Sequence, residues 1–466
     1  MAVAETLRRK LTASTVVAVL LSAAALPAHG DTLIGALAEA YVTNPQLNAQ
    51  RAITRATDET VPQALSGYRP TVTASATLGE QTQRTVSTTG GLTTVTKGAF
   101  APRSLGITGT QTLFNGFQTG NSVRQAEQQV SAARETLRVI EQTVLLNAAT
   151  AYMNLLRDTA ILELQRTNVE VLTEQLRQTR DRFAVGEVTR TDVAQAESRL
   201  AAGRSQVAQA LANWNSSRAI YQQVIGRPPG KLSAASPVDR LSPSNLSSAI
   251  SVGRGQNPNV TAAMFGIDVQ ALQVKINESS LYPTLTVSAS AQQNWDLSPT
   301  VVRQTNASVI GTLSMPLYQG GLPEANIRQS KETLTQKRLD METARDQAQS
   351  DVTQAWGRLE AAKAQILATQ AQVQAAEIAL NGVREEARVG QRTTLDVLNA
   401  QQELVNARVA LVTAQRDRVV ASYTLLASVG RLNPYVLRLP LSVYDPMVHY
   451  QQVRDVWIGV RTPDGK

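Results

Sequence analysis

The chain has 466 residues, a formal net charge of +8, an aromatic content of 4% and no cysteine. The lack of cysteine excludes disulfides, thiol nucleophiles and thiolate metal sites, and an apolar content dominated by Ala, Leu and Val suits long packed helices better than a globular enzyme. Basic and acidic residues alternate along the predicted helices, as between Arg328 and Asp346, which is typical of solvated helix faces and argues against a nucleic-acid-binding patch.

The N-terminus has the pattern of a secretory signal peptide. Arg8, Arg9 and Lys10 precede an apolar run, and Ala28-His29-Gly30 follows it. We therefore predict that residues 1–30 are removed by cleavage before Asp31. No later segment reaches the roughly 18 consecutive apolar residues of a membrane-spanning helix, so the sequence predicts that any membrane span is made of strands.

The rest of the chain contains one unit twice. Residues 387–401 are a diverged copy of residues 183–197, and the similarity extends in both directions over a whole supersecondary assembly. The predicted organisation is repeat 1 over 31–226, a proline-rich linker over 227–245, repeat 2 over 246–431 and an irregular packed C-terminal extension over 432–466.

Each repeat begins with an amphipathic helical stretch, Leu33 to Leu65 and Leu246 to Glu278, and then changes to a period of two. Alternating apolar and hydroxyl residues predict strands at about 70–80, 103–114, 283–292 and 306–318. The polar segments between paired strands, Gly79 to Arg103 and Gln293 to Thr305, are expected to be exposed hairpin loops.

The strands have one apolar and one hydroxyl face, which fits either a half-buried sheet in a soluble sandwich or a transmembrane barrel. No helix of matching apolar width is available to cover the apolar face. Because about eight strands are the practical minimum for closure, a barrel would need several copies of this chain.

The longest periodic segments predict helical hairpins over 118–226 and 323–430. Apolar residues recur every seven positions from Val123 to Ala151, step by four to Leu155 and then resume the period of seven. Such a stutter locally unwinds a left-handed supercoil. At about 1.5 Å per residue each hairpin would be about 100 Å long, so we predict two antiparallel coiled-coil hairpins per chain.

The turns of these hairpins are the candidate functional positions. Gly186 and Gly390 each follow a helix at a position that favours positive φ. Thr189 with Asp192 and Thr393 with Asp396 each fit a capping box, and capping alone accounts for both aspartates. Arg392 stands where the first repeat has Val188 and is therefore available to pair with a neighbouring hairpin.

The pattern resembles the TolC family of outer-membrane export ducts. Residues 389–400, Val-Gly-Gln-Arg-Thr-Thr-Leu-Asp-Val-Leu-Asn-Ala, are similar to the second periplasmic turn of that family, and residues 185–193 are similar to the first. The resemblance implies an α+β membrane protein in which three chains contribute four strands each to a twelve-strand outer-membrane barrel, in contact with outer-membrane lipid. Long α-helices would continue it as a periplasmic tunnel.

The family resemblance also implies roles for individual residues. Thr191, Asp192 and Arg392 match residues that link the closed tip, and Asp396 matches an inward acidic constriction. Asn399 stands where the best-known member has a second acidic residue, and Ala387 stands where it has a gate tyrosine. Arg190, absent from the family pattern, could supply a substitute link.

The predicted function is export of proteins and/or small molecules across the periplasm and outer membrane of a Gram-negative cell. The resemblance implies a homotrimer that works with a periplasmic adaptor (membrane fusion) protein and an inner-membrane transporter of the ABC, RND or MFS type. We expect neither enzymatic activity nor a cofactor, since the sequence has no phosphate-binding Gly-rich loop, metal-ligand cluster or activated nucleophile. The alternatives are a periplasmic coiled-coil adaptor or scaffold, and a single-chain porin, which the strand number disfavours.

Overall fold

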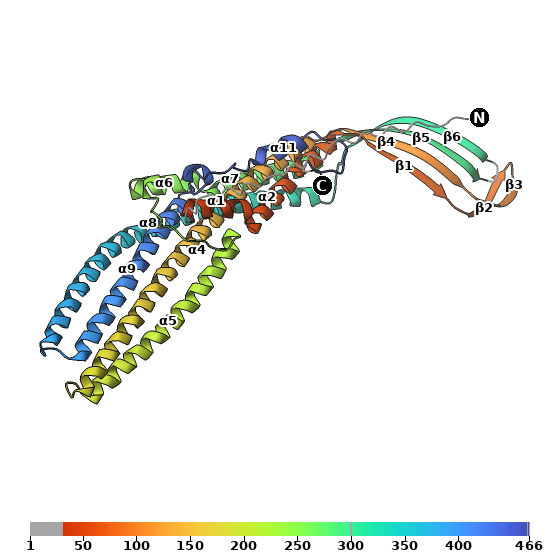
Figure 1. The fold of residues 1–466 in the computed structure, drawn as a ribbon. Helices are drawn as coiled ribbons and strands as arrows, with labels where there is room; N and C mark the ends of the chain where they lie inside the picture. The colour runs from red at the N-terminus through yellow and green to blue at the C-terminus, as the bar shows by residue number, and fades with distance from the viewer. Residues whose placement is uncertain (1–30, 299–300, 464, 466) are drawn as a thin grey trace, which may run out of the picture.

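Two helices of 67 residues each dominate the structure. This computed structural model describes residues 31–298, 301–463 and 465, so the predicted signal peptide lies outside the described residues. Figure 1 shows an elongated molecule with helical hairpins at one end and strands at the other. At about 1.5 Å per residue each long helix extends about 100 Å. The long helices and their returning partners are α4 (Gln118–Ala184) with α5 (Arg190–Ile225), and α8 (Leu322–Arg388) with α9 (Thr394–Ser428).

The seven-residue period in α4 corresponds to a buried stripe. The residues on either side of the four-residue step, Ala151 and Leu155, are both buried, so the stutter keeps the stripe turned toward the partner helices. The other buried members of the stripe are Val130, Leu137, Val144, Leu162 and Leu176.

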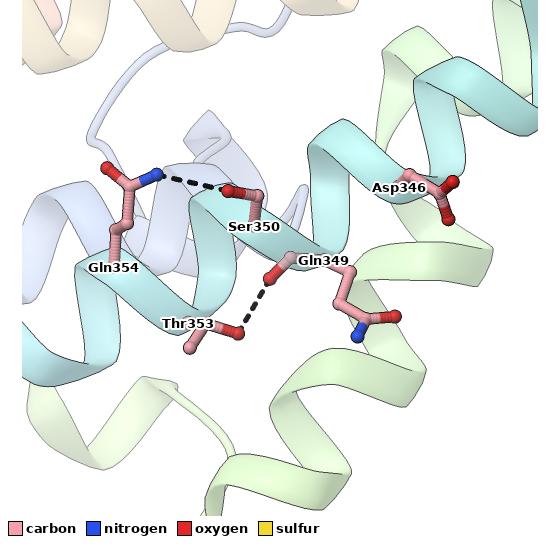
Figure 2. Close-up of a pocket in the computed structure, with 5 residues that line it drawn as sticks. All are labelled: Asp346, Gln349, Ser350, Thr353 and Gln354. Atoms are coloured by element: carbon pink, nitrogen blue, oxygen red, sulfur yellow. Dashed lines mark hydrogen bonds between the residues drawn. The ribbon is translucent and has the colours of Figure 1, made fainter.

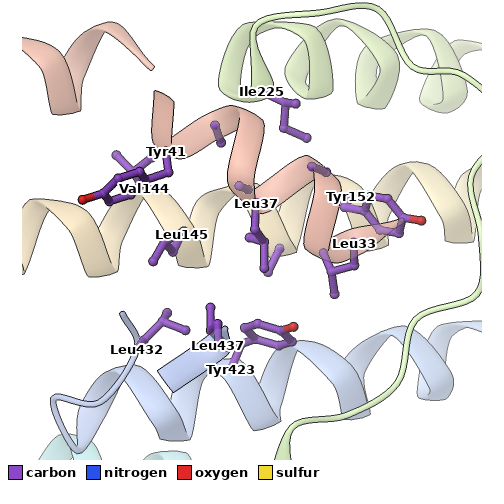
Figure 3. Packing of buried hydrophobic residues seen from close by; sticks show 14 of the residues in the cluster. Leu33, Leu37, Tyr41, Val144, Leu145, Tyr152, Ile225, Tyr423, Leu432 and Leu437 are labelled. Atoms are coloured by element: carbon purple, nitrogen blue, oxygen red, sulfur yellow. The ribbon is translucent and has the colours of Figure 1, made fainter. Parts of the chain in front are cut away.

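Shorter helices surround the middle of the long ones. They are α1 (Leu33–Thr43), α2 (Pro45–Asp58), α3 (Thr60–Leu65), α6 (Leu246–Gln256), α7 (Pro258–Glu278), α10 (Pro434–Leu437) and α11 (Pro446–Val453), with 3-10 turns η1 (Ser66–Tyr68), η2 (Asp239–Leu241) and η3 (Ser279–Leu281). Figure 3 shows the main core, in which α1 packs on α4 and α5 and residues of α9 belong to the same cluster. Its buried members include Leu37, Tyr41, Leu145, Tyr152 and Tyr423.

The sequence predicts one continuous helical stretch at the start of each repeat, and the structure instead breaks both at an Asn-Pro pair. Asn44 and Asn257 are extended, and each caps the next helix through its side-chain oxygen while proline occupies the first turn. Their amide nitrogens donate to carbonyls at the ends of the returning helices, Asn44 to Val224 at 3.1 Å and Asn257 to Ser428 at 3.0 Å. Each break therefore fastens the short helices to a hairpin.

The main sheet has four antiparallel strands in the order β1-β4-β5-β6. The strands are β1 (Thr71–Leu78), β4 (Arg103–Asn115), β5 (Thr284–Ser298) and β6 (Val301–Ser314). The sequence predicts that the fourth strand extends to about residue 318, but β6 ends at Ser314. The strand cannot continue through Pro316, which has no backbone N–H to donate to a neighbouring strand.

The predicted polar loops are largely strand, which corrects the sequence interpretation. Between β1 and β4 the chain forms a separate two-stranded ribbon, β2 (Gln81–Thr89) with β3 (Leu92–Phe100). Gly90 and Gly91 have φ of 60° and 82° and form its two-residue turn, the Gly-Gly signal that commonly joins hairpin strands. In the second repeat β5 and β6 extend into the segment that was expected to be a loop.

The C-terminal extension is less irregular than predicted, because it contains α10 and α11. It returns along the molecule toward the sheet. His449 Nδ1 lies 3.0 Å from Asp58 Oδ2 in α2, and Arg69, just before β1, donates to the carbonyl of Val456 at 2.8 Å. The extension thus fastens α2 and the base of the sheet together.

Candidate functional site

The two hairpin turns have the same backbone construction. Gly186 and Gly390 have φ of 81° and 79°. In the first turn the Gly186 N–H donates to the carbonyl of Phe183 at 3.0 Å and the Glu187 N–H to that of Arg182 at 2.9 Å, and the second turn has the equivalent bonds. This is the Schellman arrangement that ends a helix with a left-handed residue.

Both predicted capping boxes are present. The Thr189 N–H donates to Asp192 Oδ2 at 2.9 Å and the Asp192 N–H to Thr189 Oγ1 at 3.3 Å; the corresponding distances for Thr393 and Asp396 are 3.0 and 3.2 Å. Hydrogen bonds from the threonine side chain and backbone lower the pKa of both aspartates. Each aspartate is therefore held charged at the positive end of a returning helix.

Each turn also carries an ion pair that the sequence interpretation missed. Arg392 Nε donates to Glu386 Oε2 at 2.7 Å, and Arg182 Nη2 donates to Glu187 Oε1 at 2.7 Å. Within one chain Arg392 is thus paired inside its own turn rather than with Asp192. The pairing with Glu386 holds the pKa of Arg392 above its usual range.

The remaining tip candidates occupy different environments. Arg190 and Thr191 are exposed at the start of α5, and in the described part of the chain neither side chain has a hydrogen-bond partner. Asn399 accepts a hydrogen bond from Arg199 at 2.6 Å, which links α9 to α5 and therefore one hairpin to the other. Ala387 is half-buried at the end of α8.

A second polar link lies farther from the tip. Gln401 in α9 accepts from Arg384 in α8 at 2.9 Å, and its amide nitrogen lies 3.4 Å from Asn168 Oδ1 in α4. Gln401 and Asn168 are buried. Neither residue belongs to the seven-residue series of its helix, so the spacing in the sequence did not indicate this link.

At the other end of the molecule the sheet is a single layer with two different faces. Leu105, Ile107 and Val309 lie on one face, and each is more than half exposed. The opposite face carries hydroxyl pairs, such as Ser290 with Ser308 at 3.0 Å. Exposed aromatics gather where the sheet meets the helices, namely Phe117, Tyr282 and Tyr318. An apolar band bordered by aromatic side chains is typical of a surface that contacts lipid.

A shallow polar depression on α8 offers no comparable chemistry. Figure 2 shows its lining residues, Asp346, Gln349, Ser350, Thr353 and Gln354, which lie along one exposed helix. Thr353 Oγ1 donates to the Gln349 carbonyl at 2.8 Å and Gln354 Nε2 to Ser350 Oγ at 3.1 Å. These hydrogen bonds stay within α8 and are typical of a solvated helix face.

Within residues 31–298, 301–463 and 465, no three His, Cys, Asp or Glu side chains converge as a metal ion would require. No helix there is both long and apolar enough to cross a bilayer.

Comparison with known proteins agrees with this geometry. The chain matches the family described as outer membrane efflux protein over residues 36–227 and 249–431. It is 41% identical over 455 residues to the outer membrane efflux protein BepC of Brucella suis, which covers 96% of this chain and 97% of that protein. It is 26% identical over 313 residues to the outer membrane protein TolC of Escherichia coli, covering 64% and 63% respectively.

The solved structure of the Campylobacter jejuni CmeC outer membrane channel has a similar fold. The TM-score is 0.76 at 16% sequence identity, and the match covers 91% of this chain and 89% of that one.

Proposed function

This chain belongs to the outer membrane efflux protein family, and from that premise we propose that three copies form one export duct whose helical tip is a gate. The family places the protein in the outer membrane with its long helices in the periplasm. Four strands per chain then give a twelve-strand barrel, and the helical hairpins continue it as a tunnel.

The single observation that carries this proposal is the incomplete sheet. One chain presents a single four-stranded layer whose outer strands, β1 and β6, each have one unpaired edge. Its apolar face is exposed along its length. Pairing β1 of one copy with β6 of the next removes both edges and directs the apolar face to lipid and the hydroxyl face to a water-filled lumen.

The gate is proposed at the turns, because the polar side chains there are exposed and can exchange partners. Arg392, Asp192 and Thr191 would link neighbouring hairpins in the closed state, and Asp396 would form an acidic constriction. Outward movement of the returning helices would break these links and widen the tip. The bond between Arg199 and Asn399 would have to break or move in the same step, because it joins the two returning helices.

The duct would be passive and would receive cargo from an inner-membrane transporter of the ABC, RND or MFS type through a periplasmic adaptor. In this proposal the choice of cargo is assigned to the transporter.

The proposal is tested by purifying the protein from outer membranes with detergent. We expect a trimer that dissociates only on heating in SDS, stepwise conductance in planar bilayers, and an adaptor and an inner-membrane transporter cross-linked to the helical tip. Extraction without detergent, with no heat-modifiable oligomer and no conductance, would instead support a periplasmic scaffold.

A further inference from the structure

Two arginines flank a tryptophan in one row at the outer end of the sheet. In the strand register Arg103 lies directly opposite Trp295, and Trp295 lies directly opposite Arg303. Directly opposed residues in antiparallel strands project from the same face. We call Arg103, Trp295 and Arg303 the outer row. Leu105 and Ile107 follow Arg103 at intervals of two residues, so they project from the same face of β4, and the outer row therefore lies on the apolar face.

The outer row lies at the border of the apolar band. Residues 285–293 of β5 lie on the helix side of the row, and a tilted transmembrane strand needs about 9–11 residues to cross the hydrocarbon core. The lipid-facing band of an outer-membrane barrel is about 25 Å tall and ends in aromatic side chains. Trp295 therefore occupies the outer interface, as Phe117 and Tyr282 occupy the inner one.

The arginines of the outer row keep unused donors. Arg103 Nη2 donates to Asp296 Oδ2 at 2.5 Å, and Arg303 donates to the amide oxygen of Gln293 when that amide is turned toward it. Within the described residues Arg303 has no carboxylate partner. With strands about 4.8 Å apart, the Cα atoms of the two arginines lie about 10 Å apart on either side of Trp295.

The ribbon above this row adds two more cations. Arg84 in β2 lies directly opposite Lys97 in β3, and like charges in such a pair repel each other. Neither has an acidic partner in the described part of the chain. The same ribbon face carries the pair Val86 and Val95, which are both about half exposed. Figure 1 shows the ribbon at the end of the sheet farthest from the helices.

The charge balance of this end favours an anionic ligand. Residues 79–103 and 292–304 contain Arg84, Lys97, Arg103 and Arg303 against two carboxylates, Glu80 and Asp296. Guanidinium groups bind phosphate through paired hydrogen bonds. An apolar band directly below and valines beside the ribbon cations match a ligand that has both phosphate and acyl chains.

We propose that the outer row and the ribbon form a binding site for the phosphorylated glycolipid of the outer leaflet. This inference rests on the proposed barrel. Arg303 and the free donors of Arg103 contact phosphate, Trp295 lies at the boundary between headgroup and acyl chains, and Arg84 with Lys97 contact the headgroup from above. The site would anchor the ribbon on the membrane surface.

The test is native mass spectrometry of the delipidated full-length trimer with added diphosphorylated lipid A. The variant is Arg84→Gln/Lys97→Gln/Arg303→Gln, which spares Arg103 because its loss would leave Asp296 unpaired. The matched control is Arg204→Gln, an exposed arginine on α5. We expect about tenfold fewer lipid adducts in the triple variant, roughly 1.4 kcal/mol, and no change in the control. Dephosphorylated lipid A should bind the wild type as weakly as diphosphorylated lipid A binds the triple variant.

Equal adducts in wild type and triple variant would overturn the inference, as would equal binding of the dephosphorylated lipid. Displacement of lipid A by millimolar inorganic phosphate would also overturn it, because the site would then bind a free ion. Heat-modifiable trimer and bilayer conductance are recorded for every variant. A conducting trimer without phosphate-dependent adducts rejects the glycolipid site alone, whereas absence of the trimer rejects the proposed duct.

Discussion

Arg182 and Glu386 occupy the same position of the two repeats and carry opposite charges. The offset that places Gly186 on Gly390 also places Arg182 on Glu386, and each is paired within its own turn, Arg182 with Glu187 and Glu386 with Arg392. The duplicated turn has therefore kept its backbone and reversed the direction of its ion pair. In the proposed trimer, Arg182 of one turn and Glu386 of another would be able to face each other with opposite charges.

Reversing the charge of Arg182 should loosen the tip without unfolding it. In Arg182→Glu the new carboxylate repels Glu187 and also a neighbouring turn that presents Glu386. We expect higher closed-state conductance in planar bilayers and an almost unchanged melting temperature, because exposed ion pairs contribute little to stability. The exchanged variant Arg182→Glu/Glu187→Arg restores the pair within the turn. If both variants conduct as the wild type does, the turn charges have no role in closure.

Gly430 should tolerate substitution much less well than Gly390, although their φ angles are 81° and 79°. A Cβ at Gly430 would lie 2.5 Å from the carbonyl oxygen of Gln256, whereas nothing lies within 4 Å of one at Gly390. We expect Gly430→Ala to destabilise the chain by about 2 kcal/mol or more and Gly390→Ala by about 1 kcal/mol. Thermal melts of helical circular dichroism measure both, and similar losses would contradict the close approach of α9 to Gln256.

Glu141 should make stability fall as pH rises. It is buried in α4, where it accepts a hydrogen bond from the Tyr41 hydroxyl at 3.1 Å, and burial raises its pKa. A carboxyl whose pKa is raised by folding contributes stability below its unfolded pKa of about 4.3, and this contribution is lost as pH rises through the folded pKa.

The variant Glu141→Gln keeps an acceptor for Tyr41 and removes the titration. The melting temperature of the wild type relative to this variant should therefore decrease from pH 4 upward. A difference that does not vary with pH would show that Glu141 does not titrate with a raised pKa.

The sequence predicted the elements that repeat with a strong period and missed those that depend on local pairing. The seven-residue period of α4 follows from burial of one helix face. The alternation in β1 follows from the different chemistry of the two sheet faces, one apolar and one hydroxyl-bearing. Both patterns are therefore visible in the residue order. The ribbon was missed because Thr, Ser and Gly between strands indicate a loop equally well. The Gly90-Gly91 pair was the available signal for a hairpin turn, and the strand register from Gln81 with Phe100 to Thr89 with Leu92 shows the ribbon.

At the candidate site, too, the local features could be predicted from the sequence and the contacts between distant segments could not. Capping boxes are local, so Thr189 with Asp192 could be predicted from three-residue spacing. The bond between Arg199 and Asn399 joins different repeats and depends on how two hairpins pack, which no spacing in the chain encodes. The partner of Arg392 is Glu386, six residues away across the turn. This spacing differs from the i, i+3 and i, i+4 spacings of helical ion pairs, so it was not visible in the sequence.

The most direct test of the gate is single-channel conductance of Arg392→Ala against Arg388→Ala in planar bilayers. Arg388 is a matched control, because it is an exposed arginine four residues away that pairs with Glu385 on its own helix. We expect a higher closed-state conductance for Arg392→Ala and wild-type conductance for Arg388→Ala. Wild-type conductance in Arg392→Ala, or an equal increase in both variants, would contradict the assignment of the gate to this turn.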